Sequence, residues 1–267
     1  MASFSVVSNI ASANAQANLH ASQLGMQKAL NRLSSGFRIN GSGDDAAGLV
    51  VANQYRTDVA VINQGIRNAN DGLSDLQIKD GALSNVATLL DRLATLAAQA
   101  ASGTTTDDSR ATLDAEFADV LEEIDREVIV AGLDSNAGFS VFVSADGTDG
   151  EVSGTINAVS TSDLGIDGES LAAQADAETA VTAVRDAIAT LGESQAKIGA
   201  LQNRLQFAIS LAQSQAVNTA AAESRIRDAN IAEESANMTR YNILTQSGIA
   251  ALAQANNSTS AVLALLR

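Results

Sequence analysis

No proline occurs in any of the 267 residues. Proline interrupts a helix because its ring removes a backbone N–H donor and clashes with the preceding turn. A chain without proline, and with abundant Ala, Leu and Gln, can therefore form helices of unusual length. The first expectation is a mainly α fold.

Apolar residues recur at alternating steps of three and four in two long segments, as they do along a coiled-coil seam. The first series is Leu73, Leu76, Asp80, Leu83, Ala87, Leu90, Ala94 and Ala97, and the second is Val184, Ile188, Leu191, Gln195, Ile198, Gln202, Leu205 and Ile209. We expect the first series to belong to one helix from about Asp44 to Ala101. The sequence Asn70-Asp71-Gly72 is nevertheless a turn signal inside this helix.

A third helix and a β-hairpin are predicted between these two segments. Thr106 and Asp107 are cap candidates, and a helical face follows at Leu113, Phe117, Val120, Ile124 and Val128. From Gly138 to Thr161 the pattern changes to Val, Phe, Ser and Thr with Asp-Gly turns, which indicates a hairpin near 138–161. The predicted fold is a long antiparallel coiled-coil or helical-bundle rod with one small β-hairpin.

The two ends of the chain are short of charge. Residues 1–43 contain no Asp or Glu, and Tyr241–Leu266 contains no charged residue. The N-terminal segment has one apolar stripe through Leu19, Met26, Leu30, Leu33 and Phe37 and a second through Ile10, Ala13, Ala17 and Leu24. A helix with two stripes must be covered on two sides, although each stripe alone is also compatible with the core of a single helical hairpin.

Copies of the same chain are the simplest cover for the second side, because head-to-tail contacts that do not close build a helical filament. The acidic middle, Thr106–Glu178, would then face solvent. The predicted polymer interface consists of Ile10, Ala17, Leu24, Leu30, Leu33, Tyr241, Leu252, Val262 and Leu266.

Composition argues against several classes of function. The formal charge of −15 disfavours nucleic acid, and the absence of Cys with a single His, His20, disfavours catalytic, cofactor and metal sites. Polar residues interrupt the uncharged C-terminal stretch too often for a membrane span. The first 30 residues contain no Sec-type signal, so we expect export by another route.

Three features suggest chemistry but also have simpler interpretations. Gly41-Ser42-Gly43 lacks the lysine of a phosphate loop, and Ser42 with Asp45 fits a helix capping box. The acids of Glu122–Glu127 could attract a divalent cation or form a solvated face. Ser and Thr in the hairpin region, such as Ser153 and Thr155, could carry glycans, which the sequence alone does not decide.

Several motifs near both ends closely resemble those of bacterial flagellins. They are Asn31–Asn40 (NRLSSGFRIN), Asp44–Leu49 (DDAAGL), Arg67–Gly72 (RNANDG), Gln202–Arg204, Ser224–Asp228, Ala236–Arg240, Leu252–Asn256 and Val262–Arg267. The resemblance covers roughly residues 1–130 and 176–267, in the same order as in the family. It implies a structural subunit of the bacterial flagellar filament, for motility.

The resemblance also implies a domain organisation. N- and C-terminal helices would pair as an inner-tube domain, residues 1–43 plus 225–267, and residues 44–224 would form a rod-like helical domain without outer variable domains. The spoke between them would include Gly36, Arg38, Asn40, Asp44 and Asp45. Because the usual Phe-Asn-Gly is replaced by Leu133–Phe139, the hairpin entry is expected to differ from the family pattern.

The partners implied by the resemblance are other flagellin copies, a flagellar secretion chaperone, a filament cap and hook-associated proteins. Export unfolded through the flagellar type III system would give a secreted protein, with an external or periplasmic filament left open. A Toll-like receptor surface would comprise Leu90, Arg92, Leu96, Gln99 and Glu116, with weakened recognition because neighbouring polar partners are replaced. The alternatives are a hook–filament junction protein and, less favoured, a soluble enzyme.

Overall fold

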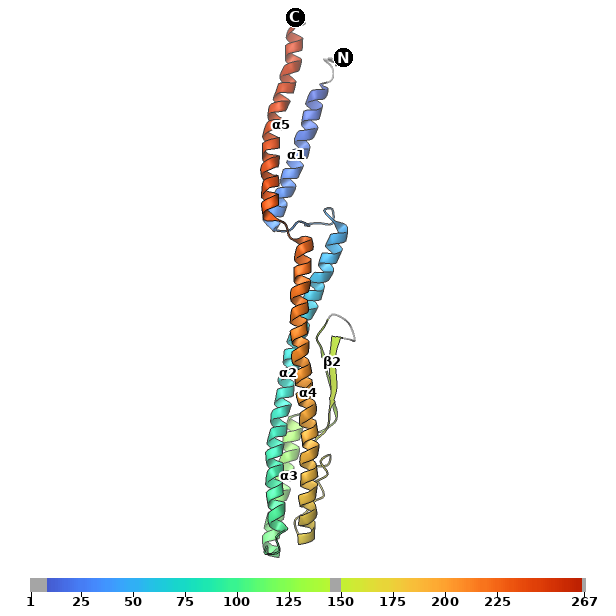
Figure 1. Cartoon of the computed structure of the whole chain (residues 1–267), viewed down its shortest axis with the longest axis vertical. Helices are drawn as coiled ribbons and strands as arrows, with labels where there is room; N and C mark the ends of the chain where they lie inside the picture. Colours follow the sequence, from blue (N-terminus) through green and yellow to red (C-terminus); the bar gives the residue numbers. More distant parts are fainter. Residues whose placement is uncertain (1–8, 145–149, 266–267) are drawn as a thin grey trace. The chain divides into compact units, whose positions relative to one another are not determined.

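The computed structural model describes the backbone of residues 9–144 and 150–265 and the side chains up to residue 258. Within this part the chain forms five helices and one two-stranded antiparallel sheet (Figure 1). The elements in chain order are α1 (Ile10–Ser35), α2 (Ala46–Ala100), α3 (Asp107–Val130), β1 (Ala137–Phe142), β2 (Glu151–Ile156), α4 (Gln174–Arg227) and α5 (Ile231–Leu265). The prediction of a mainly α fold with a small hairpin near 138–161 is confirmed.

The chain divides into two compact units. Unit 1 comprises residues 1–57 and 218–267, and unit 2 comprises residues 58–217. Helices α2 and α4 each run from one unit into the other. The domain boundaries predicted near residues 43 and 225 remain a prediction about the assembled protein.

Helix α2 is continuous through Asn70-Asp71-Gly72, so the predicted helix is confirmed and the turn signal inside it does not produce a turn. Gly72 instead allows the hairpin to pack closely, because a Cβ built on it would lie 2.7 Å from Cγ2 of Val141. The capping box at Ser42 is wrong. Asp45 caps α2, and its Oδ1 accepts a hydrogen bond from the backbone N–H of Gly48 at 2.9 Å.

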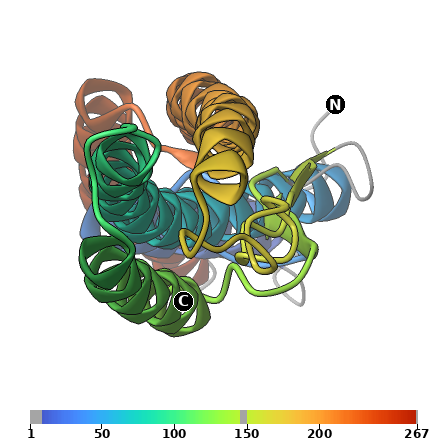
Figure 2. The same cartoon turned by 90° about the horizontal axis from the view of Figure 1, so that it is seen from below.

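Unit 2 has one hydrophobic core to which α2, α3, α4 and the hairpin all contribute. The end-on view in Figure 2 shows the three helices grouped with the hairpin segments against them. Leu76, Leu83 and Leu90 of α2 are completely buried, as predicted from their spacing. Burial of each leucine contributes about 2 kcal/mol of hydrophobic stabilisation.

The predicted seam of α4 consists of two rows of positions, each with a spacing of seven residues, and one of these rows is buried as predicted. Val184, Leu191, Ile198 and Leu205 are buried, but the second buried row is Ala187, Ser194 and Leu201 instead of Ile188, Gln195 and Gln202. Leu201 lies against the hairpin, where a Cβ built on Gly154 would be 2.6 Å from Leu201 Cδ2. The hairpin therefore covers a side of α4 that a helix-only packing pattern leaves open.

Helix α3 is tied to its neighbours by side chains that satisfy loop backbone groups. Thr106 caps its N-terminus as predicted, with its side chain accepting from Ser109 N. Asp125 accepts hydrogen bonds from both the N–H and the hydroxyl of Thr161, at 2.9 and 2.7 Å. The buried Arg110 guanidinium donates to the carbonyl of Ala100 at 3.0 Å, which stabilises the end of α2.

Candidate assembly interface

Helices α1 and α5 pack side by side and antiparallel in unit 1 (Figure 1). Small residues set their spacing, since a Cβ built on Gly25 would lie 2.5 Å from the ring of Tyr241. At the far end the Asn9 side chain caps α1 and donates from Nδ2 to the carbonyl of Ala255 at 3.0 Å. The pairing of the N- and C-terminal helices expected from the resemblance is therefore present.

One ion pair fixes the opposite end of this helix pair. Arg32 Nη1 of α1 donates to Glu234 Oε1 of α5 at 2.8 Å. Glu234 is only 7% exposed, so its carboxylate has little access to water and depends on Arg32 for neutralisation. The pair selects one register between the two helices, because a shift of one turn would leave the buried carboxylate without a partner.

The two linkers that adjoin these helices are paired with each other. Phe37 and Asp228 form an isolated antiparallel bridge, and Arg38 donates from its backbone N to Arg227 O and from Nη2 to Ile226 O, both at 2.7 Å. The Arg227 guanidinium lies 4.2 Å from the centroid of the Phe37 ring, a cation–π contact. Gly36 allows the chain to turn here, with φ of 75°.

A second ion pair closes the linker between α1 and α2. Lys28 Nζ lies 2.6 Å from Asp44 Oδ1. The hydrogen bond from Lys28 lowers the pKa of Asp44, and a bond from the Asn40 backbone N–H and the charge of Arg32 act in the same direction. A polar cavity of about 420 Å³ lies beside this pair, between the C-terminal half of α1 and the linker.

Unit 1 buries few of its apolar side chains. Among its described residues, those that are buried are Ala29, Ile39, Ala52 and Glu234. Its exposed large apolar residues are Ile10, Leu24, Leu30, Val50, Val51, Ile231, Ile243, Leu244 and Ile249, of which Ile10 is 67% and Ile243 is 61% exposed. Seven of these side chains lie on α1 and α5, and apolar side chains exposed in such number on two helices are typical of a surface that another protein covers.

The predicted interface residues fall into three groups. Ile10, Ala17, Leu24 and Leu30 are exposed on α1. Leu33, Tyr241 and Leu252 are half-buried, and Tyr241 packs on α1 within the same chain. The side chains of Val262 and Leu266 lie outside the described residues.

The sequence-based interface omitted three exposed apolar residues in the uncharged part of α5. These are Ile243, Leu244 and Ile249. They lie off the heptad spacing that runs from Tyr241 through Gly248 to Leu252, and that spacing marks the contact with α1. The lack of charge throughout 241–258 was the signal that both faces of this helix are apolar.

The predicted immune-receptor surface needs a correction. Leu90 and Leu96 are 0% and 1% exposed, so the core of unit 2 occupies both side chains and neither is available for contact. Arg92 and Glu116 remain exposed and form an ion pair between α2 and α3, and Gln99 is exposed. Any recognition at this place would use the three polar residues alone.

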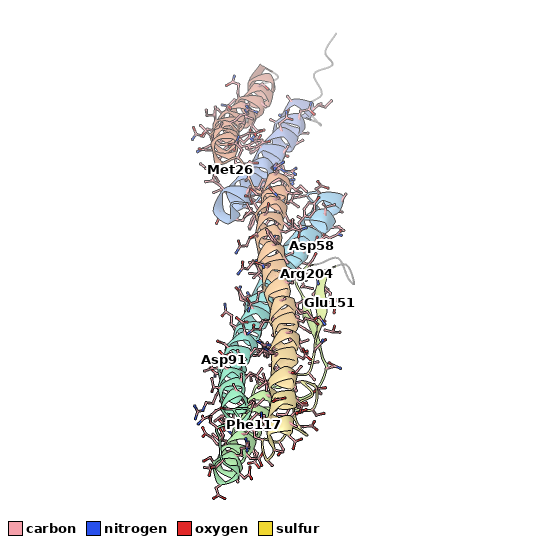
Figure 3. The ribbon with its side chains drawn as sticks, turned by 60° about the horizontal axis from the view of Figure 1, so that its bottom comes forward. Met26, Asp58, Asp91, Phe117, Glu151 and Arg204 are labelled. Atoms are coloured by element: carbon pink, nitrogen blue, oxygen red, sulfur yellow. The ribbon has the colours of Figure 1, made fainter. Side chains whose placement is uncertain are left out.

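The described part of the chain has a second exposed apolar surface, which lies in unit 2, on α4 beside the hairpin. Phe207 and Leu211 are 77% and 60% exposed. A cavity of about 250 Å³ between α4 and the hairpin is lined by Val143, Val152, Ala208, Leu211 and Ala212 together with Gly150, Glu151, Ser144 and Gln215. Figure 3 labels Arg204 on α4 and Glu151 on the hairpin, and Arg204 Nη1 donates to Ser153 O at 2.9 Å.

Several of the acids of α3 are engaged with other side chains of this protein. Glu123 is paired with Arg126, which lowers the pKa of Glu123 through a side-chain hydrogen bond, and Glu127 accepts from Asn85 Nδ2 at 2.8 Å. Among the described residues, no group of three or more His, Cys, Asp or Glu side chains could hold a metal ion, and His20 is exposed. None of the helices in this part of the chain has the length and apolar character that crossing a membrane requires.

Comparison with known proteins agrees with this geometry. Residues 6–131 match the bacterial flagellin N-terminal helical region, and residues 181–266 match the bacterial flagellin C-terminal helical region. The chain is 35% identical to a flagellin of Halalkalibacterium halodurans and 34% identical to the flagellar filament 33 kDa core protein of Treponema phagedenis. Each alignment covers 97% of this chain and 98% of the relative.

A solved structure of a flagellar hook-associated protein from Vibrio parahaemolyticus shares the fold alone. Its TM-score is 0.55 at 15% sequence identity, over 69% of this chain and all of that one. The two matched family regions together span most of the chain, and the paired terminal helices with their uncovered apolar faces lie within them. This chain belongs to the bacterial flagellin family.

Proposed function

We propose that the chain is the structural subunit that self-assembles into the helical filament of a bacterial flagellum. The observation that carries the proposal is the apolar outer surface of the α1–α5 pair, which the described residues of the chain leave exposed. A surface of this kind, on helices without an acidic face, is stable when identical copies pack against it. The role is structural, without catalysis.

The distribution of charge also supports contacts between copies through unit 1, with unit 2 facing solvent. Residues 58–217 contain 25 acidic and 8 basic side chains, a net charge of −17, whereas the remaining residues have a net charge of +2. Contacts between copies through unit 1 therefore meet little electrostatic repulsion, and the strongly acidic unit 2 keeps the polymer in solution. Polymer contacts through unit 1 therefore bring copies together with the least electrostatic repulsion.

The uncharged stretch of α4 is a second proposed contact between copies. No charged residue occurs between Arg204 and Glu223, and this stretch presents the exposed Phe207 and Leu211. In a unit of net charge −17, a face without acids is where another copy can approach without burying unpaired carboxylates. We assign it to a neighbouring copy in the filament.

Export and delivery are proposed from family membership. The chain would leave the cell unfolded through the flagellar type III system, bound beforehand by a secretion chaperone, and fold beneath a filament cap after the hook-associated proteins are in place. The filament would be secreted, to an external or a periplasmic location. The half-buried seam of the α1–α5 pair is consistent with terminal helices that become fully ordered only on assembly.

Electron microscopy of purified chain mixed with sheared filament seeds tests the proposal. We expect narrow helical filaments, and we expect the double substitution Ile243→Ser and Ile249→Ser to prevent their growth. Both side chains are more than half exposed, so the substitutions remove an outer apolar surface and leave unchanged Tyr241 and Gly248, which contact α1.

Ile129→Ser is the matched control, because Ile129 is 64% exposed on the acidic helix α3. Its filaments should grow as those of the parent chain do. Discrete particles of the parent chain under every condition would favour the junction-protein alternative. Normal filaments from the double variant would contradict the assignment of the outer α5 face to the interface.

A further inference from the structure

Asn40 and Gly41 form the only Asn-Gly pair in the sequence, and they lie in the linker between α1 and α2. Asn40 is exposed, and a Cβ built on Gly41 would meet no atom within 4 Å. Both residues line the 420 Å³ cavity beside the Lys28–Asp44 ion pair. The Asn40 side chain is therefore accessible, and no neighbouring atom crowds the Cα of Gly41.

The backbone N–H of Gly41 is not held in regular structure. Among the described residues it donates no hydrogen bond, whereas its carbonyl accepts one from Asp44 N at 3.0 Å. Asn53 and Asn68 are different, because each is followed by a residue inside α2 whose N–H belongs to the helical hydrogen-bond ladder. Asn40 is thus followed by the smallest residue, and the backbone N–H of that residue donates no hydrogen bond among the described residues.

We propose that Asn40 is a site of spontaneous deamidation through a cyclic imide formed with Gly41. Such ring closure requires the backbone nitrogen of the following residue to approach the side-chain amide carbon. Glycine permits the approach because it has no Cβ and the widest range of backbone conformations. Asn is among the least stable side chains towards heat for this reason.

The reaction uses water as its only co-reactant. The Gly41 nitrogen attacks Cγ of Asn40, the Cγ–Nδ2 bond breaks, and the proton lost from Gly41 N leaves with the amide nitrogen as ammonia. Water then opens the five-membered imide at either carbonyl. One product is aspartate at position 40, and the other is isoaspartate, in which the main chain runs through the former side-chain carbons.

The product carboxylate would change the electrostatics of this linker. It would form in the cavity that Lys28 and Arg32 line, and these cations stabilise a new anion there. It would compete with Asp44 for Lys28, whose Nζ is 2.6 Å from Asp44 Oδ1. Isoaspartate would in addition lengthen the linker by one backbone atom and remove its original hydrogen-bond geometry.

Peptide mapping of the folded full-length chain, incubated at neutral pH and physiological temperature, tests the proposal. Trypsin releases Ile39–Arg56, which contains Asn40 and also Asn53 as an internal control in α2. We expect this peptide to gain the mass difference between amide and acid over days, with fragment ions placing the change at residue 40. Two isomeric products should separate by chromatography.

Two variants and an unfolded sample complete the experiment. Gly41→Ala should fold, since nothing obstructs its new Cβ, and should slow the conversion many-fold; Asn40→Gln should abolish the change in this peptide. The chain in denaturant gives the rate without structure. Conversion of Asn40 in the folded chain at a rate comparable to the denatured one supports the proposal, whereas an intact Asn40 alongside conversion in denaturant overturns it.

Discussion

Gly65 is the residue at which α2 comes closest to the hairpin. A Cβ built on it would lie 2.2 Å from the carbonyl oxygen of Val143, well below the 3.0 Å that non-bonded Cβ atoms keep from their neighbours. The obstacle is main chain and not a flexible side chain, so either the hairpin or the helix would have to move. Gly81 lies on the same helix with no atom within 4 Å of its built Cβ.

Gly65→Ala should therefore destabilise unit 2 by about 1–3 kcal/mol through overpacking, despite the better helix propensity of alanine. Gly81→Ala should stabilise it by about 0.5–1 kcal/mol, because the same gain in propensity meets no obstacle. Thermal unfolding followed by circular dichroism compares the two. Equal shifts of the melting temperature in both variants would contradict the close contact with Val143.

The ionisation of Asp44 should depend most strongly on one neighbour, Lys28. Lys28 holds the pKa of Asp44 below its ordinary value of 3.8, so the carboxylate is stabilised in the folded chain. This stabilisation is complete above the ordinary value and is lost as the pH falls through the lowered pKa of the folded state.

Carbon-detected NMR titration of the Asp44 carboxyl measures this pKa directly. We expect a midpoint below 3.8 in the parent chain and an upward shift in Lys28→Met. The carboxyl of Asp58, at the start of unit 2, would be followed as a second resonance in both samples. A midpoint that does not move on removal of Lys28 would mean that the ion pair is absent in solution.

At the scale of elements, the linkers flanking α1 and α5 are joined through few contacts. Arg38 makes two hydrogen bonds to carbonyls at the end of α4, and Ala229 N donates to Gly36 O at 2.9 Å. The Arg38 guanidinium satisfies a carbonyl that the helix end leaves without an intrahelical donor. Movement of one linker is therefore transmitted to the other.

Arg38→Gln should loosen this connection while leaving the core of unit 2 unchanged. Loss of the charged hydrogen bond to Ile226 O costs about 1–2 kcal/mol of local stability. The amide of Ala229 should exchange its hydrogen faster by the corresponding factor of roughly ten. Amides of the buried α2 residues Leu83 and Leu90 are the control, and uniform acceleration at those positions would point to global destabilisation instead.

The elements differ in how far the sequence predicts them. Absence of proline and apolar spacing predict α2 within a few residues at each end, because nothing in Ala46–Ala100 removes a backbone donor and the helical spacing continues through it. The turn signal at Asn70–Gly72 and the second row of the α4 seam were misleading for one physical reason. Local spacing does not show that the hairpin packs against Gly72 on α2 and Leu201 on α4.

The sequence predicts which helices form the candidate interface, but it identifies only some of the exposed residues on them. The lack of charge identifies the terminal helices, and exposure of Ile10 and Leu24 agrees with the stripe assigned to assembly. Tyr241 was assigned to the same surface but packs on Gly25. When both faces of a helix are apolar, the sequence pattern does not show which face packs within the chain and which faces another copy. That distinction requires the structure of the α1–α5 pair.

At the scale of the whole molecule, the uneven charge determines how copies should respond to salt. The net charge of −17 in residues 58–217 makes neighbouring copies repel each other, while the proposed contacts of unit 1 are apolar and independent of salt to first order. Screening acts over about 8 Å at physiological ionic strength. Repulsion between the acidic units is therefore the salt-sensitive part of assembly.

The critical concentration for filament growth should fall as ionic strength rises from low to physiological values, because screening removes repulsion without weakening the apolar contacts. Sedimentation of seeded samples at each salt concentration measures the unassembled chain directly. The variant Ile243→Ser with Ile249→Ser is the control, since salt cannot restore an apolar contact that is missing. If the critical concentration of the parent chain stays constant across this range, repulsion between the acidic units does not limit assembly, and their net charge must already be neutralised by bound counterions.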